Sequence, residues 1–529
     1  MSSIDRRVTW VGTVLLLCFV LLFVQMNNLQ VREASALNHN PLNFHITTPV
    51  SPFFQARGEI ISADGFVLAY SRRTDDEYRY LRVYPKLTAR MFSDITGYYA
   101  NAVEAVQFGV EASYNNYLQE HPVLPGTLGA LLGQREETDN VYLTISEKLQ
   151  AVAMNALDSS TAKDGGAIVV IDPQTGAILA MYGYPNYDPN GFAVHNPTAV
   201  DNLASSDLSL AFDPRVNYAI SEREPPGSTM KVITTSAIFD HDPQIERQFF
   251  PPLSSITFPN SPGSQPLQNY GGEICPAGGG YLPEILAHSC DTAYAEIGDE
   301  LGYTALSEEA HAFGFCLGLS ETDECQGPGD IPPIDLPDAV ASLLPPSSTV
   351  DGANPYIGYS AIGQFDDGAT VLGMALVAAA IADNGTIMAP HVVARAVNQY
   401  GETEFTYHPH VWRTATSAAT AVQVRQLMTG VTLFGTASGL FASWYADGLP
   451  TIAAKTGTAE PGENTCGTEN WLIALGPAGV GQTPTVAVAA MVPVTEEECS
   501  TEIFSPTGAT VAGPVLLPVL QAALAMQGG

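Results

Sequence analysis

Basic residues are scarce in this chain, which has 21 Lys and Arg against 55 Asp and Glu among its 529 residues. The formal net charge of −34 argues strongly against a nucleic-acid partner, because phosphate is repelled by such a surface. It equally disfavours broad adsorption to anionic lipid. The acidity is typical of a solvated surface, or of a protein from an acidic or saline habitat.

Metal-ligating residues are also few. No Cys-x-x-Cys spacing occurs, and only His408 and His410 lie close together, in what we expect to be an exposed turn. This distribution gives a zinc site little support. Internal repeats and low-complexity tracts are absent as well.

Long apolar runs are limited to one, residues 8–24, preceded by Arg6 and Arg7. The length is at the lower end for a spanning helix, and the basic flank places the N-terminus in the cytoplasm. A cleaved signal peptide is the alternative. The small-x-small sequence at 34–36 lies too far beyond the run for ordinary cleavage, and Cys18 inside the run disfavours a lipoprotein site. We therefore predict a retained anchor.

Apart from Cys18 there are six cysteines, an even number that suggests disulfides in an exported chain. Free buried thiols are the alternative. Proximity in sequence is the only guide to pairing, and it predicts Cys275 with Cys290, Cys316 with Cys325, and Cys466 with Cys499.

A chain of this length exceeds one ordinary domain. Residues 27–142 have no sustained period and suit a small α+β domain, whereas helical and strand patterns become regular beyond 143. The expected strands are 167–171, 177–182, 453–458, 472–476 and 486–492, and the expected helices include 149–157, 231–239, 371–382 and 515–526, the last with Pro518 near its first turn. This order predicts a central sheet whose first hairpin comes early and whose other strands come late.

The segment Ser228-Thr229-Met230-Lys231 follows Pro225-Pro226-Gly227, so we expect a helix to begin at Ser228. Residues three apart share a helical face, so Ser228 and Lys231 can meet. A serine hydroxyl needs a base to become a nucleophile, and a lysine can serve if burial and the helix N-terminus keep its amine neutral.

A second segment, Lys455-Thr456-Gly457-Thr458, lies on an apolar strand. Gly457 leaves room for a substrate along the strand, where Lys455 and the hydroxyls of Thr456 and Thr458 can bind a carboxylate. The backbone N–H groups of Ser228 and Thr458 are candidates for an oxyanion hole. Neither segment alone identifies a catalytic site. Their occurrence together with Ser289-Cys290-Asp291, in this order, indicates one.

Over nearly its whole length the chain resembles a class B penicillin-binding protein, a monofunctional peptidoglycan DD-transpeptidase, most of all the actinobacterial members. Besides the three segments, the resemblance is carried by Arg57–Ile60, Gly166–Gly176, Tyr184–Asn190, Asn217–Lys231, Ile362-Gly363-Gln364 and Trp471.

The resemblance implies an α+β or α/β architecture with four parts. These are a cytoplasmic tail (1–7), a single transmembrane helix (8–26), a small non-catalytic pedestal domain (27–142), and a serine transpeptidase domain like that of β-lactamases, with a central antiparallel sheet flanked by helices (143–529). It places the protein in the cell membrane with its catalytic domain outside the cytoplasm. The implied partners are stem peptides ending in D-Ala-D-Ala, β-lactams and a SEDS-family glycan polymerase.

The same resemblance implies that Ser228 attacks the penultimate D-Ala carbonyl, Lys231 is the base, Ser289 relays a proton, and Lys455, Thr456, Gly457 and Thr458 bind substrate. No cofactor is implied. Asp291 departs from the family, which usually has Asn there. An ionised Asp only accepts hydrogen bonds and favours the ammonium form of Lys231. Four alternatives are open: Asp291 is protonated, its charge is tolerated because other cations lie near, the enzyme is slow, or the side chain points away from the site.

Two other functions compete: a serine β-lactamase, and an impaired member acting as a scaffold for a glycan polymerase. Among single residues, Gln364 either contacts bound peptide or is a buried amide, and Trp471 is expected in the core. For His288 we favour a packing or surface role, because Lys231 already provides the base. Arg57 and Glu59 are expected to brace the domain interface.

Overall fold

The computed structural model describes residues 3–27, 52–76, 78–100, 108–119, 138–160, 165–207, 213–258, 266–318, 325, 329–347, 356–460, 467–495 and 506–527. The chain divides into two compact units, each taken by itself here: Met1–Gln55 with Thr74–Tyr80, and Ala56–Arg73 with Leu81–Gly529.

The first unit contains α1 (Ser3–Asn27) and a short 3-10 helix (Pro52–Phe54). Large apolar side chains of α1, among them Trp10, Phe19 and Phe23, are exposed. In the part of the chain that the structure describes, no helix combines the length and the apolar character needed to cross a membrane. The anchor expected at residues 8–26 therefore stays a prediction.

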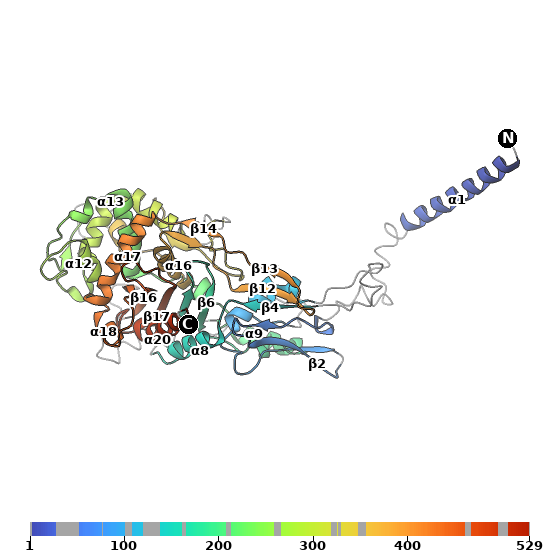
Figure 1. The fold of residues 1–529 in the computed structure, drawn as a ribbon, viewed down its shortest axis with the longest axis horizontal. Helices are drawn as coiled ribbons and strands as arrows, with labels where there is room; N and C mark the ends of the chain where they lie inside the picture. The colour runs from blue at the N-terminus through green and yellow to red at the C-terminus, as the bar shows by residue number, and fades with distance from the viewer. Residues whose placement is uncertain are drawn as a thin grey trace. The chain divides into compact units, whose positions relative to one another are not determined.

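The second unit is built on a five-stranded antiparallel sheet in the order β15-β16-β17-β5-β6. Figure 1 labels three of its strands, β16, β17 and β6. The early hairpin is β5 and β6, and the late strands are β15, β16 and β17, which confirms the predicted order. Their bounds are Gly166–Ile171, Ile178–Tyr184, Ala453–Ala459, Thr468–Gly476 and Val486–Val494.

Helices cover both faces of this sheet. Successive side chains of a strand point to opposite faces, so Ile168 and Val170 pack with α8 (Glu147–Asp158) and α20 (Ala512–Gln527). Val169 and Ile171 pack on the other side with α16 (Val371–Ala382), whose residues are all buried. Burial on both faces explains why these strands are continuously apolar rather than alternating.

The last helix differs from the prediction in one respect. It begins at Ala512 rather than near Val515, so Pro518 lies inside the helix and not near its first turn. Proline removes the hydrogen bond to the carbonyl four residues earlier, here that of Pro514. Both prolines are exposed, so that carbonyl can be hydrated, which makes the position tolerable.

A second sheet of six strands has the order β13-β12-β4-β1-β2-β3. Four of its strands come from the early part of the chain, but β12 (Val393–Asn398) and β13 (Thr403–Thr406) come from far along it. β12 pairs antiparallel with β4 (Asp139–Leu143), and β4 pairs parallel with β1 (Ile60–Ile61). β2 is Val67–Arg73 and β3 is Tyr80–Val83. Sequence patterns gave no sign that the later segment completes this sheet.

The remaining elements pack around these sheets. The helices are α4 (Ser93–Thr96), α5 (Gly109–Ser113), α6 (Asn115–Leu118), α9 (Pro197–Asp207), α10 (Tyr218–Ser221), α11 (Lys231–His241), α12 (Leu282–Ala287), α13 (Asp291–Ala312), α15 (Tyr356–Ala361), α17 (Ala418–Leu433) and α18 (Ser438–Ala446). The short strands are β7 (Ser255–Ile256), β8 (Leu267–Gln268), β9 (Phe315–Leu317), β10 (Ser342–Leu344), β11 (Thr386–Met388) and β14 (Val411–Thr414).

Two of the three predicted disulfides are present, Cys275–Cys290 and Cys316–Cys325. Cys466 and Cys499, the third predicted pair, lie outside the described residues. Cys18 is free and exposed.

A buried ionic cluster holds the small domain together. Glu111 is completely buried and forms ion pairs with Arg57 at 2.8 Å and Arg82 at 2.6 Å. The two guanidinium groups lower the pKa of Glu111 below its ordinary value and overcome the opposing effect of burial. Arg57 therefore braces the interior of this region, and the expected role of Arg57 and Glu59 at the domain interface stays a prediction.

Replacing Glu111 by Gln should destabilise the protein by about 3–5 kcal/mol, because two buried guanidinium groups lose their counter-charge. The midpoint of chemical denaturation, followed by circular dichroism, measures this change. Asp213→Asn is the matched control, since its ion pair with Arg215 is partly exposed and its loss should cost less than about 1 kcal/mol. Equal effects of the two substitutions would contradict the importance of the buried cluster.

Candidate active site

The three sequence segments that lie far apart in the chain meet in one place. Ser228 is on a 3-10 turn (Gly227–Met230), Lys231 is the first residue of α11, and Asp291 is the first residue of α13. Ser289 lies just before α13, and Lys455 is on β15. The helix expected to begin at Ser228 thus begins as a 3-10 turn and continues as α11.

The amine of Lys231 is the centre of a hydrogen-bond network. Its Nζ lies 2.9 Å from Ser228 Oγ, 2.6 Å from Asp291 Oδ1, and 2.8 Å from the carbonyl oxygen of Ser289. The Lys231 side chain has no exposed surface. The predicted meeting of Ser228 and Lys231 across one helical turn is present.

Backbone geometry fixes the turn that carries Ser228. Gly227 has φ +51°, a left-handed conformation that glycine adopts without strain, and its N–H donates to the carbonyl of Gly363 at 2.9 Å. A Cβ on Gly227 would come within 2.9 Å of the Thr458 carbonyl oxygen. The turn is therefore wedged between residue 363 and the strand β15.

Ser289 stands between two lysines. Its Oγ is 2.8 Å from Lys455 Nζ and 3.3 Å from Lys231 Nζ. Its backbone is left-handed, with φ +59°, which is uncommon for a residue other than glycine and typical of strained functional positions. One hydroxyl thus connects the amine beside Ser228 to the amine on the sheet edge.

Asp291 points into the site. Oδ1 accepts from Lys231 and lies 3.4 Å from Ser228 Oγ, while Oδ2 accepts from the backbone N–H of Tyr270 at 3.2 Å. The alternative in which Asp291 turns away is therefore wrong. The carboxylate is an acceptor for every group that contacts it.

Burial lowers the pKa of both lysines. Desolvation lowers the pKa of Lys231 below its ordinary value, even though Asp291 acts in the opposite direction. Burial, and then the charge of Lys231, lower the pKa of Lys455 well below its ordinary value. Two ammonium groups that share one hydroxyl repel each other, so the arrangement favours a neutral amine on one of them.

The strand β15 lies at the end of the five-stranded order, so among the described strands it pairs only with β16. On Gly457 a Cβ would lie 2.8 Å from the carbonyl oxygen of Pro226, which explains the glycine. The Thr456 hydroxyl is 2.7 Å from that of Thr436, and the Thr458 hydroxyl accepts from the N–H of Gly508 at 3.2 Å.

Several residues that contact the site were not predicted from the sequence. Tyr294 places its ring 5.4 Å from Lys231 Nζ, and Tyr270, Asn269 and Thr436 support Asp291, the start of α13 and Thr456 respectively. Tyr294 lies three residues after Asp291 on α13, so the helical period could have indicated that both side chains lie on the same face of the helix. No local pattern indicated the other three.

The structure shows where three further residues lie whose roles the sequence left open. Trp471 is fully buried, as expected, and its Nε1–H donates to the carbonyl of Pro225 at 2.8 Å. His288 is exposed and its ring lies 6.2 Å from that of Phe434, away from the network above. Gln364 donates from Nε2 to the Thr458 carbonyl at 3.5 Å.

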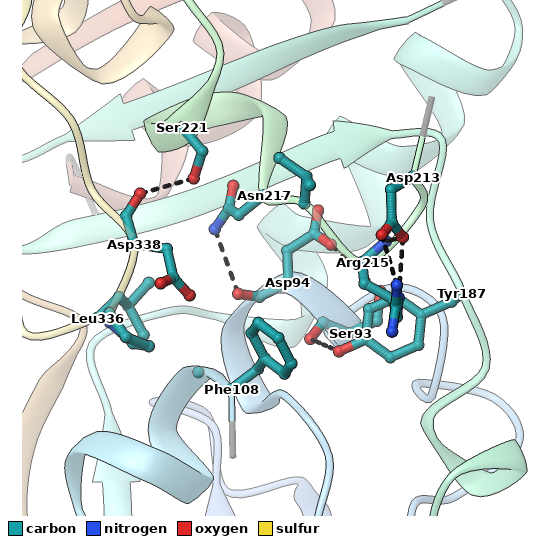
Figure 2. Close-up of a pocket in the computed structure, with 13 residues that line it drawn as sticks. Ser93, Asp94, Phe108, Tyr187, Asp213, Arg215, Asn217, Ser221, Leu336 and Asp338 are labelled. Atoms are coloured by element: carbon teal, nitrogen blue, oxygen red, sulfur yellow. Dashed lines mark hydrogen bonds and ion pairs between the residues drawn. The ribbon is translucent and has the colours of Figure 1, made fainter. Parts of the chain in front are cut away.

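A separate cavity of about 200 Å³ contains none of these residues. Figure 2 shows Asp94, Asn217 and the Arg215–Asp213 pair around it, with Phe108 and Leu336. Asn217 donates to the backbone carbonyl of Asp94 at 3.2 Å, and burial raises the pKa of Asp94 to about 8.

The arrangement can activate a serine for acyl transfer. Ser228 has a buried amine within hydrogen-bond distance, the Ser289 hydroxyl connects that amine to a second lysine, and beside them lies an edge of β15 that pairs with no other described strand. Among the residues described, no group of three or more His, Cys, Asp or Glu side chains is placed to hold a metal ion.

Comparison with known proteins gives two family matches. A model described as the penicillin-binding protein transpeptidase domain matches residues 166–521, and one described as the penicillin-binding protein A dimerisation domain matches residues 57–140.

Relatives and a solved structure are similar over most of the chain. Peptidoglycan D,D-transpeptidase PbpA of Mycolicibacterium smegmatis is 34% identical over 99% of both chains, and PbpA of Mycobacterium tuberculosis is 32% identical over 96% of both. The ceftriaxone acyl-enzyme of penicillin-binding protein A from M. tuberculosis superposes with a TM-score of 0.74 at 31% identity, covering 89% of this chain and 99% of that one.

Replacing Gly457 by Ala should push the Ser228 turn away from β15, because the new Cβ would meet the Pro226 carbonyl and the methyl of Thr229 at 3.0 Å. We expect Ser228 to lose at least tenfold in its rate of reaction with a serine-directed acylating reagent. Gly439→Ala is the control, because nothing lies within 4 Å of its Cβ position in α18. Unchanged reactivity of the Gly457 variant would show that the strand and the turn need not touch.

Proposed function

Because the chain belongs to the penicillin-binding protein transpeptidase family, we propose that it is a peptidoglycan D,D-transpeptidase that crosslinks stem peptides through an acyl-enzyme on Ser228. The observation that carries the proposal is the 2.9 Å contact between Ser228 Oγ and the fully buried amine of Lys231. The full-length similarity to PbpA and the acyl-enzyme of the solved relative support it.

In the first half-reaction, neutral Lys231 takes the proton of Ser228 as Oγ attacks the carbonyl of the penultimate D-Ala. Collapse of the tetrahedral intermediate breaks the peptide bond. The proton held by Lys231 reaches the leaving nitrogen through Ser289, whose Oγ is 3.3 Å from Lys231. Free D-Ala departs and the stem stays esterified to Ser228.

In the second half-reaction, an amine from a neighbouring stem attacks the ester. Lys231 accepts the proton of that amine and returns it to Ser228 Oγ as the ester bond breaks. A new peptide bond joins the two stems and the serine hydroxyl is restored. Both halves use the same short path between Ser228 and Lys231.

The edge of β15 is the proposed substrate-binding surface. The terminal carboxylate of the donor stem binds near Lys455 and the hydroxyls of Thr456 and Thr458, and the stem runs along the strand, where Gly457 presents no side chain. The N–H groups of Ser228 and Thr458 would stabilise the oxyanion. The packing of Gly227 on Thr458 supports a close approach of these two segments.

We assign the chain to a tail (1–7), a membrane anchor (8–26), a pedestal domain (27–142) and a transpeptidase domain (143–529). The exposed apolar side chains of α1 support the anchor, and the two disulfides support a location outside the cytoplasm. The partners that follow are D-Ala-D-Ala stems, β-lactams, the membrane and a SEDS-family glycan polymerase.

Asp291→Asn tests how the base stays neutral. Asp291 raises the pKa of Lys231, so its removal should lower that pKa further. Acylation by a fluorescent penicillin requires neutral Lys231, so its rate should rise with pH. In the variant this rise should occur at lower pH. The acylation rate of the variant at pH 7 should be equal to or higher than that of the unsubstituted protein. Asp299→Asn, an exposed change on the same helix, is the control. A clear loss of labelling would show that the carboxylate itself is required.

Benzylpenicillin distinguishes the proposed enzyme from its rivals. Intact-protein mass spectrometry should show a stable adduct of one antibiotic molecule per chain, located on Ser228 by peptide mapping and absent from Ser228→Ala. Ser205→Ala, on exposed α9, should keep the adduct. Steady release of hydrolysed antibiotic would identify a β-lactamase, and a folded protein with no adduct would identify a scaffold.

A further inference from the structure

Phe365 holds an unusual backbone conformation beside the active site. Its φ is +73°, in the left-handed region that costs free energy for any residue with a Cβ and is an outlier for a bulky side chain. Three other non-glycine residues of the described chain share a positive φ: Ser289, Asp338 and Asn384. Asn and Asp tolerate this region, and Ser289 belongs to the candidate active site. The residue type explains the positive φ of the first two, but not that of Phe365.

The ring of Phe365 is not a core side chain. It is 38% exposed and stacks on Tyr356, which is 36% exposed, with ring centroids 4.4 Å apart and planes 22° apart. Burial of the ring therefore accounts for little of the backbone strain. The stacked pair, hereafter the platform, presents aromatic surface to solvent.

The segment before Phe365 is built into the active site. A Cβ on Gly363 would lie 2.1 Å from the carbonyl oxygen of Gly227, directly before the nucleophile. Gln364 reaches the Thr458 carbonyl on the edge of β15 at 3.5 Å. Phe365 therefore directly follows the residue that contacts β15, and one residue separates it from Gly363, which packs against the turn that carries Ser228.

The direction of the donor stem places its earlier residues on this side. With the terminal carboxylate at Lys455 and Thr456 and the scissile carbonyl at Ser228, the stem continues past Thr458. Gln364 contacts β15 at Thr458. We therefore infer that the residue before the two D-alanines leaves the strand on the side where Gln364 and Phe365 lie.

We propose that the platform of Phe365 and Tyr356 binds the apolar part of the donor-stem residue that precedes D-Ala-D-Ala, and that it determines specificity at that position. The inference rests on the proposed transpeptidase function. Aromatic faces bind aliphatic and aromatic groups well, and a ring held rigidly by its stacking partner loses little freedom on binding. The left-handed backbone turns the side chain of Phe365 out to Tyr356, where it can serve this purpose.

Two β-lactams test the proposal. Benzylpenicillin carries a phenylacetyl arm in place of the preceding stem residue, whereas 6-aminopenicillanic acid has the same bicyclic core without the arm. The second-order rate of acylation of Ser228 is measured for both on the full chain. The variants are Phe365→Gly, which removes the ring and relieves the backbone, and Tyr356→Ala. The controls are Phe365→Tyr, which keeps the ring, and Asn384→Gly, another positive-φ position.

We expect both platform variants to lower the benzylpenicillin rate about three- to tenfold, the size of one aromatic contact, with the rate for 6-aminopenicillanic acid unchanged. The melting temperature of Phe365→Gly should be no lower than that of the unsubstituted protein, because the strain is relieved. Both controls should keep the original ratio of the two rates.

Equal loss of both rates, or a drop in melting temperature with it, would make Phe365 a packing residue and overturn the proposal. An unchanged ratio in the platform variants would overturn it too. In each of these cases acylation of the unsubstituted protein still stands, whereas failure of both β-lactams to acylate the unsubstituted protein would refute the proposed function itself.

Discussion

The active site depends on keeping a lysine amine out of water. Lys231 has no exposed surface, and desolvation favours its neutral form, the form that the proposed role as base requires. Asp291 at 2.6 Å opposes this. Lys455 contacts the same Ser289 hydroxyl, and its pKa is lowered well below its ordinary value by burial and then by the charge of Lys231. Burial and Asp291 thus act on the pKa of Lys231 in opposite directions, and burial is the larger effect.

The sheet edge is the second constraint, and it explains where glycine occurs. Gly227, Gly363 and Gly457 are the points at which the nucleophile turn, the 362–364 segment and β15 approach one another, and a Cβ at any of them would meet backbone oxygen within 2.9 Å. The turn that carries Ser228 is therefore positioned by close backbone packing. Its stiffness comes from contacts with no side chains to rearrange, which suits a site that must hold reacting atoms in register.

Local patterns predicted what depends on local sequence. The apolar runs at 167–171 and 486–492 became central strands, the all-apolar stretch 371–382 became α16, and the three-residue spacing of Ser228 and Lys231 placed them in contact. The features that were not predicted depend on pairing between residues far apart in the sequence. Strands β12 and β13 join a sheet formed mainly by residues more than 250 positions earlier, and Tyr270 reaches Asp291 from a loop. The start of α20 was predicted three residues too late, at Val515 instead of Ala512.

Asp291 shows why a motif mismatch needs geometry before it can be interpreted. From sequence, the carboxylate could be protonated, tolerated, harmful or turned away. The structure removes the last option and shows that its second oxygen accepts a backbone N–H, a bond that an Asn could also make through its oxygen. An Asn would differ in adding a donor where Lys231 and Ser228 now contact Oδ1. The Asp thus makes the site more acceptor-rich, and its effect on turnover follows from how far burial keeps Lys231 neutral.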